Sequence, residues 1–288
     1  MRERWKQAGL VFLSLLAVFA MMAGYTTLVA PIISRFVSEG HLLYAGHIGL
    51  AAVCLAAYLA ATRLIERRIP TELSLSHALP ALGAGMLIGC AQFSLVMTVL
   101  WIAGAYIPQG WNSVEGVWLA GLFHLAIGTR EEIFYRGLLF RLCSTVVGTW
   151  GALLLNAVIF AAMHLNSPGW TPAGLCSVAL AGVMFAAAYV ATGRLWLPIG
   201  MHAAWNFTQG SVFGLQVSGN DTGSGLIAGT LEGPDFLTGG PFGPEATIVT
   251  VVVLLATTAY FLWRMVKLGR IERPIWSEAK RRPAPAPA

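Results

Sequence analysis

The chain has 288 residues, of which 57% are apolar and only 11% are charged. Soluble domains carry about 25% charged residues, so this composition, with a mean hydropathy of +0.70, excludes an ordinary soluble enzyme and indicates a polytopic membrane protein. The net charge of +5 does not indicate nucleic acid as a partner, because the basic residues form short clusters between apolar segments and build no basic, aromatic-interleaved groove.

The apolar segments are long and unbroken, unlike the period-two alternation of a membrane β-barrel. Because a spanning helix needs about 20 apolar residues, they predict an all-α fold, a membrane helix bundle with about eight transmembrane helices in a single domain over residues 1–288. The predicted spans are residues 9–33, 42–65, 81–107, 114–141, 148–165, 173–191, 195–213 and 246–263. Pro80 and Pro198 suit the first turns of the third and seventh spans.

The fourth span contains an unusual charged stretch, Arg130-Glu131-Glu132 followed by Arg136. Residues 114–128 are too short to cross the bilayer alone, so the helix must continue through both glutamates. Ionisable residues at that depth are costly and mark a functional site by default. A turn near Val147-Gly148 would place Glu131 and His164 at similar depth, at about 1.5 Å per residue, whereas His202 looks shallower.

The predicted arrangement is strongly asymmetric in charge. Every Lys and Arg except Arg35 falls on one side when Arg130, Arg136 and Arg141 are counted in the inner part of the fourth span. The positive-inside rule then places both termini in the cytoplasm. The Gly-rich residues 214–245 would lie outside, either as a lid over the site or, as favoured, as a plain flexible connector, with solvated acidic residues. Residues 276–288 are predicted to be a disordered tail.

Three short polar patterns stand out within the apolar spans. Glu132 and Arg136 are four residues apart and share a helix face, as do His202 and Asn206; Phe160 precedes His164 by one turn. With Glu131, these side chains supply a general base, orienting groups and an oxyanion donor for amide hydrolysis. The remaining histidines are interpreted as ordinary loop or helix-face residues: His41, His47, His77 and His124.

These patterns match those of a known family. Glu131-Glu132 with Arg136, Phe160 with His164, and His202 with Asn206 resemble the E-E-x-x-x-R, F-x-x-x-H and H-x-x-x-N motifs of the CPBP intramembrane proteases, which are related to CAAX prenyl endopeptidases and bacteriocin-processing enzymes and were once called Abi proteins. The resemblance covers about residues 117–210, the motif-bearing core.

The resemblance implies a membrane-embedded endopeptidase that cuts lipidated (CAAX-like) or membrane-associated proteins. Glu131 would activate water with help from His164, His202 and Asn206 would stabilise the oxyanion, and Glu132 with Arg136 and Phe160 would support the site. Which glutamate is the base stays open.

A metal-free glutamic mechanism without a cofactor is favoured, because the histidines lack the H-E-x-x-H spacing. A zinc peptidase with Glu131, His164 and His202 as ligands is the alternative.

Two other functions compete with proteolysis. The same scaffold could serve as a non-catalytic membrane immunity or partner protein. Intramembrane carboxylates and histidines also serve proton relays in small-solute transporters, although no duplicated half is visible. The expected partners are a protein or peptide substrate, prenylated or otherwise membrane-associated, and the lipid bilayer; the sequence carries no signal for an oligomeric state. The four cysteines form no C-x-x-C pair and indicate neither a disulfide framework nor a metal site.

Overall fold

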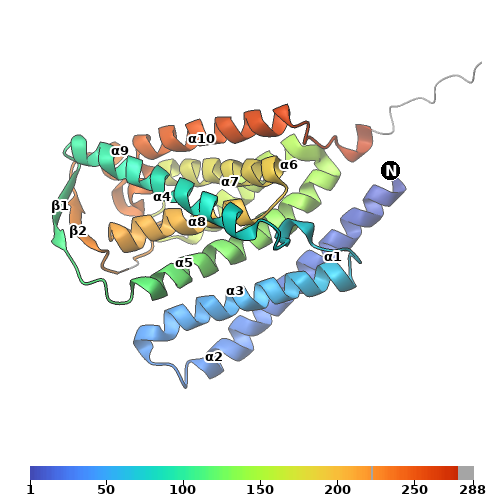
Figure 1. The fold of residues 1–288 in the computed structure, drawn as a ribbon, viewed down its shortest axis with the longest axis horizontal. Helices are drawn as coiled ribbons and strands as arrows, with labels where there is room; N and C mark the ends of the chain where they lie inside the picture. Colours follow the sequence, from blue (N-terminus) through green and yellow to red (C-terminus); the bar gives the residue numbers. More distant parts are fainter. Residues whose placement is uncertain (222, 278–288) are drawn as a thin grey trace, which may run out of the picture.

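The computed structural model describes residues 1–221 and 223–277 and shows an all-α bundle with one small sheet at one end (Figure 1). The α-helices are α1 Arg2–Gly24, α2 Ala30–Ile33, α3 Glu39–Leu64, α4 Ala78–Ile102, α5 Val117–Glu132, α6 Arg141–Met163, α7 Pro172–Thr192, α8 Trp196–Phe207, α9 Asp235–Thr238 and α10 Ile248–Lys267. The π-helical segments are η1 Tyr25–Val29, η3 Ile133–Phe140 and η5 Thr208–Val212, and the 3₁₀ turns are η2 Thr71–Leu73, η4 His164–Asn166, η6 Gly240–Phe242, η7 Pro244–Ala246 and η8 Ile275–Ser277. Strands β1 Tyr106–Trp111 and β2 Ile227–Leu231 pair antiparallel.

The predicted helix bundle is confirmed, and the chain is an integral membrane protein. Six helical segments of the described chain are long and apolar enough to span a membrane. One of them, residues 117–166, contains a break and covers two predicted spans, and α8 with η5 corresponds to the predicted seventh span but is shorter. Each predicted span therefore has a helix, while the count of eight membrane crossings stays a prediction.

The turn predicted near Val147-Gly148 lies at Gly148. This residue has φ 76° and ψ 172°, a conformation that favours glycine. A Cβ here would come within 2.8 Å of the Pro274 backbone nitrogen. The neighbouring Thr149 amide donates to the Glu272 carbonyl at 3.0 Å, so the break in α6 is fixed against the C-terminal segment.

Helix α8 is held against α4 by glycines that bring the two backbones into contact. An added Cβ would lie 2.2 Å from the Leu197 carbonyl oxygen at Gly85, 2.3 Å from that of Met201 at Gly89, and 2.3 Å from that of Leu82 at Gly200. Small residues at such crossings are typical of packed membrane helices. This contact fixes α8, which carries His202 and Asn206.

Two boundary predictions need correction. The helix of the third predicted span, α4, ends at Ile102 and not at residue 107. Residues 106–111 form β1, because their backbone groups pair with β2 in the segment predicted to be a connector. Trp276 and Ser277 lie in the short turn η8, whereas residues 278–288 of the predicted tail fall outside the described residues. The four cysteines are free, as predicted.

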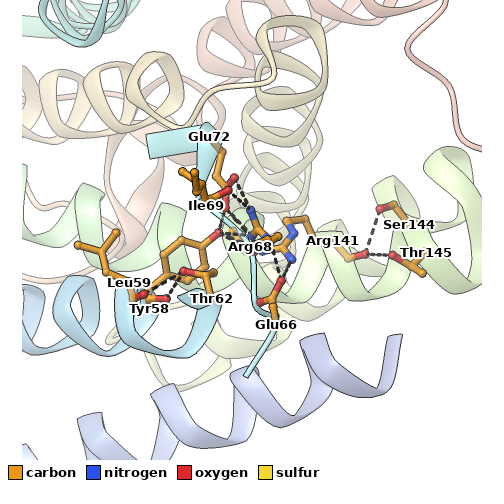
Figure 2. A network of polar contacts seen from close by, with 11 residues as sticks. Tyr58, Leu59, Thr62, Glu66, Arg68, Ile69, Glu72, Arg141, Ser144 and Thr145 are labelled. Atoms are coloured by element: carbon orange, nitrogen blue, oxygen red, sulfur yellow. Dashed lines mark hydrogen bonds and ion pairs between the residues drawn. The ribbon is translucent and has the colours of Figure 1, made fainter. Parts of the chain in front are cut away.

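A network of ion pairs joins α3, the connector after it and α6 (Figure 2). Arg68 donates to both carboxylate oxygens of Glu72, at 2.7 and 2.9 Å, and to Glu66 at 2.8 Å. Tyr58 also donates to Glu72, and Arg141 donates to Glu66. Burial acts to raise the pKa of Glu72, but the hydrogen bonds from Arg68 and Tyr58 outweigh it and hold that pKa below its usual value.

We expect this network to make the protein acid-sensitive. A carboxyl whose folded-state pKa is lowered stabilises the fold above the unfolded pKa, about 4.3 for Glu, and this stabilisation is lost as pH falls through the folded pKa. Arg68→Ala should lower the free energy of unfolding at pH 7 by about 1.5–3 kcal/mol and weaken the acid dependence. Unfolding in detergent at pH 7 and at stepwise lower pH measures both effects. The exposed neighbour Arg67→Ala is the control, and equal losses in the two variants would contradict the prediction.

Candidate active site

Both glutamates of the charged stretch lie inside one continuous helix, as predicted. Glu131 and Glu132 end α5, and the chain continues without a break through η3 into α6. The π-helical segment η3 carries Tyr135 and Arg136 directly after the glutamates. π-Helical turns are frequent at functional sites, and this one follows the two carboxylates that the sequence singled out.

Glu132 is the centre of a buried ionic group. Its Oε1 accepts a hydrogen bond from Arg136 Nη1 at 2.8 Å and another from His202 Nδ1 at 2.8 Å. The side chains of Glu132 and Arg136 are both completely buried. The guanidinium of Arg136 also lies 4.6 Å from the centroid of the Phe160 ring, where cation–π attraction adds to the ion pair. Glu132 is therefore held by its hydrogen bonds to Arg136 and His202.

His202 meets the motif residues of the other helices, although its depth looked shallower from the sequence. Its Nε2 lies 3.9 Å from Glu131 Oε2, on the side of the ring opposite the bond to Glu132. The imidazole stacks on Phe185 of α7, with centroids 4.9 Å apart and planes 11° apart. Phe185 was missed in the sequence because an apolar residue in an apolar helix gives no signal.

Glu131, in contrast to Glu132, lines an open cavity of about 490 Å³. Its side chain is 20% exposed, and its Oε1 accepts a hydrogen bond from Arg130 Nη2 at 2.9 Å. The same cavity is lined by His164, His202 and Asn206. The structure thus brings the three sequence motifs together, with Glu131 as the glutamate that has access to water.

His164 directly follows α6, the helix that carries Phe160, and begins the 3₁₀ turn η4. Its Nδ1 donates to the Phe160 carbonyl at 2.8 Å, and its ring lies edge-on to the Phe160 ring at 4.9 Å. In this tautomer Nε2 is left as a hydrogen-bond acceptor. Asn206 lies one turn after His202 on α8 and is 7% exposed. Its amide supplies a neutral N–H donor group at the cavity.

A further carboxylate reaches this site from the segment predicted to be a plain connector. Glu245 is 7% exposed, and its Oε2 accepts a hydrogen bond from Ser218 at 2.8 Å. Both residues line a side pocket of about 50 Å³ together with His164 and His202. Burial raises the pKa of the Glu245 carboxyl above its ordinary value. The predictions of a plain connector and of a solvated Glu245 are therefore wrong.

The reason lies in the glycines of this segment, which were interpreted only as a sign of flexibility. Gly219 has φ 78°, and its amide donates to the Phe242 carbonyl at 3.0 Å; the Phe242 side chain is completely buried. The left-handed turns fold the segment back onto the site, and an apolar anchor holds it there.

Two histidines and two arginines also need new interpretations. His124 is 1% exposed, lies 3.1 Å from the Ser211 hydroxyl through Nε2, and lines the large cavity with His47. Neither is an ordinary helix-face residue, because the cavity extends past both. Arg130 and Arg136 belong to the site, so they do not count as cytoplasmic charges.

Zinc sites in proteins need at least three side-chain ligands, and Glu131, His164 and His202 are the candidate set. Within residues 1–221 and 223–277, no three His, Cys, Asp or Glu side chains lie close enough together to hold a metal ion. Nδ1 of each histidine is hydrogen-bonded, to the Phe160 carbonyl and to Glu132, which leaves Nε2 as the atom that could bind a metal. Because no three such groups converge in the described residues, the side-chain positions seen here do not form a zinc site.

Comparison with known proteins supports the resemblance seen in the motifs. Residues 113–208 match the family model described as type II CAAX prenyl endopeptidase Rce1-like. This segment runs from the loop before α5 to the start of η5 and contains every motif residue. No match was found among curated proteins or among solved structures.

Proposed function

We propose that this chain, which residues 113–208 assign to the CAAX prenyl endopeptidase family, is an intramembrane endopeptidase that uses Glu131 to activate water. The observation that carries the proposal is the unequal surroundings of the two glutamates. Glu132 has no exposed surface and binds Arg136 and His202, while Glu131 faces the cavity that His164 and Asn206 share. A general base must reach the proton that it abstracts, directly or through one water.

The proposed reaction begins with a water held between Glu131 and His164. Glu131 removes a proton from this water, and the water oxygen bonds to the scissile carbonyl carbon. His164 Nε2 accepts a hydrogen bond from the O–H that remains. The carbonyl oxygen becomes an oxyanion, which accepts a hydrogen bond from the Asn206 amide. When His202 is protonated at both ring nitrogens, its Nε2 donates a second hydrogen bond to the oxyanion. The C–N bond then breaks, and Glu131 passes its proton to the leaving amine.

Glu132 acts in this scheme through His202. By accepting the Nδ1 proton at 2.8 Å, it fixes the ring so that Nε2 is directed to the cavity side, where Glu131 lies 3.9 Å away. A carboxylate behind a catalytic histidine commonly has this orienting role. Arg136 keeps the Glu132 carboxylate in place. Phe160 and Phe185 lie beside the Arg136 guanidinium, and Phe185 also stacks on the His202 ring.

The proposed orientation places both termini in the cytoplasm. Contacts gather the chain ends at one end of the bundle: Arg4 donates to the Arg273 carbonyl at 2.9 Å, and Arg270 donates to the Ala191 carbonyl at 3.1 Å. The basic residues at the ends of α1, α3, α7 and α10 lie in this region. In the described chain Arg35 is the one basic residue near the opposite ends of the helices, so the positive-inside rule still favours this orientation without Arg130 and Arg136.

Cleavage assays in detergent test the proposed reaction. Purified protein is given a library of lipidated C-terminal peptides, and new peptide ends are identified by mass spectrometry. We expect wild type to cleave, and Asn206→Ala to lose about 10²–10³-fold in kcat because an oxyanion donor is removed. His164→Ala should also be impaired, whereas His41→Ala, an exposed histidine outside the cavity, should cleave normally.

The same assay separates the alternatives. A chelator should leave wild-type cleavage unchanged; loss of activity with chelator that Zn²⁺ restores would overturn the metal-free scheme. If wild type cleaves no peptide while the protein remains folded, the protease proposal fails and a non-catalytic membrane partner becomes the better interpretation.

A further inference from the structure

The large cavity runs from the catalytic residues toward one end of the bundle. Its inner part is formed by Glu131, His164 and His202. Its outer part is formed by Tyr44 near the start of α3, Ser167 in the loop after α6, and Asn220 and Asp221 in the segment after η5.

These outer residues come from helix ends opposite to the basic, terminus-bearing end. Helix α3 runs from the end near Tyr44 to the ion-pair network beyond Leu64, and α6 runs from the Gly148 break, fixed to the C-terminal segment, to His164. Figure 1 shows the N-terminus and the C-terminal end of α10 on the side of the molecule away from β1 and β2. The mouth of the cavity is thus distant from the N-terminus and from the C-terminal end of α10.

The other side of the catalytic residues is closed in the described chain. Ile133, Leu138, Leu195 and Ile199 are all completely buried and form one packed cluster with Tyr58. Tyr58 in turn belongs to the ion-pair network at the basic end. Packed apolar side chains and then buried ion pairs therefore separate the catalytic residues from the basic end.

We propose that the active-site cavity opens on the extracytoplasmic face of the membrane and that its substrates are peptide segments presented from that side. That the cavity receives a substrate rests on the proposed function. The direction of the opening rests only on the position of the cavity and on the distribution of charged residues. It implies that cytoplasmic prenylated C-termini, which approach from the closed side, are not cleaved in an intact membrane.

Cysteine accessibility in sealed vesicles tests the direction of the opening. In a chain with the four native cysteines replaced, Ile127→Cys places a thiol in the cavity wall one turn before Glu131. A charged, membrane-impermeant methanethiosulfonate should modify it in right-side-out vesicles and not in inverted ones. Asn220→Cys at the mouth should behave alike, and Ser76→Cys at the basic end should show the opposite pattern. Leu122→Cys, exposed on the same helix but outside the cavity lining, should react slowly in both.

Cleavage in the same vesicles then tests the substrate class. A peptide that wild type cleaves in detergent, made too polar to cross the bilayer, should be cleaved at least ten times faster by right-side-out than by inverted vesicles. Modification of Ile127→Cys from the inside, or only after solubilisation, would overturn the proposed opening. If the labelling pattern holds but no peptide is cleaved even in detergent, the opening stands and the proposed proteolysis fails instead.

Discussion

Glu131→Gln should lower kcat strongly without lowering the stability of the fold, whereas Glu132→Gln should lower both. Glu131 lines the cavity and makes one hydrogen bond to its own neighbour, Arg130. A glutamine fills the same space but cannot accept a proton from water, and loss of a general base lowers kcat by about 10²–10⁴-fold. Glutamine at position 132 instead leaves Arg136 buried without its counter-charge, which is costly.

Paired measurements distinguish the two roles. The kcat on a cleaved peptide and the midpoint of thermal unfolding are recorded for each variant in the same detergent. Glu115→Gln, at an exposed position before α5, is the matched control and should change neither quantity. A Glu131→Gln variant that keeps wild-type kcat would remove Glu131 as the base, and loss of stability as large as that of Glu132→Gln would show that it is a structural residue.

The sequence was sufficient to predict the parts of this site that follow from local geometry. Span length placed Glu131 and Glu132 within a membrane helix, and the glycine at position 148 indicated the turn that brings His164 back to the same cavity. Helical spacing paired Glu132 with Arg136, and the structure has that ion pair at 2.8 Å. All of these depend on residues close together in the chain.

The contact of His202 with Glu132 could not be predicted, because it depends on where α8 begins within the bundle. Leu195, just before α8, is completely buried, and its amide donates to the Glu72 carbonyl at 2.9 Å. The first turn of α8 therefore lies inside the protein and not at the membrane surface, so counting residues from Arg194 made His202 look too shallow. The role of Glu245 was hidden in the same way, because only the folded connector carries it to the cavity.

Arg136→Met should give the largest loss of stability in the motif region. Arg136 is completely buried, donates to Glu132 at 2.8 Å, and lies against Phe160 and Phe185. Methionine preserves much of the apolar contact but leaves the Glu132 carboxylate with His202 alone. Removing one partner of a buried ion pair costs about 3–5 kcal/mol, which should appear as a lower midpoint in denaturant or heat.

A double variant shows whether the loss comes from the unpaired charge. Adding Glu132→Gln to Arg136→Met removes the stranded carboxylate, so the double variant should recover stability relative to Arg136→Met even though it carries a second change. It should still lack activity, because His202 would lose its charged partner at Nδ1. Arg35→Met, an exposed arginine outside the site, should stay within about 0.5 kcal/mol of wild type. If the double variant is no more stable than Arg136→Met, packing around the guanidinium, and not its charge, is what Arg136 contributes.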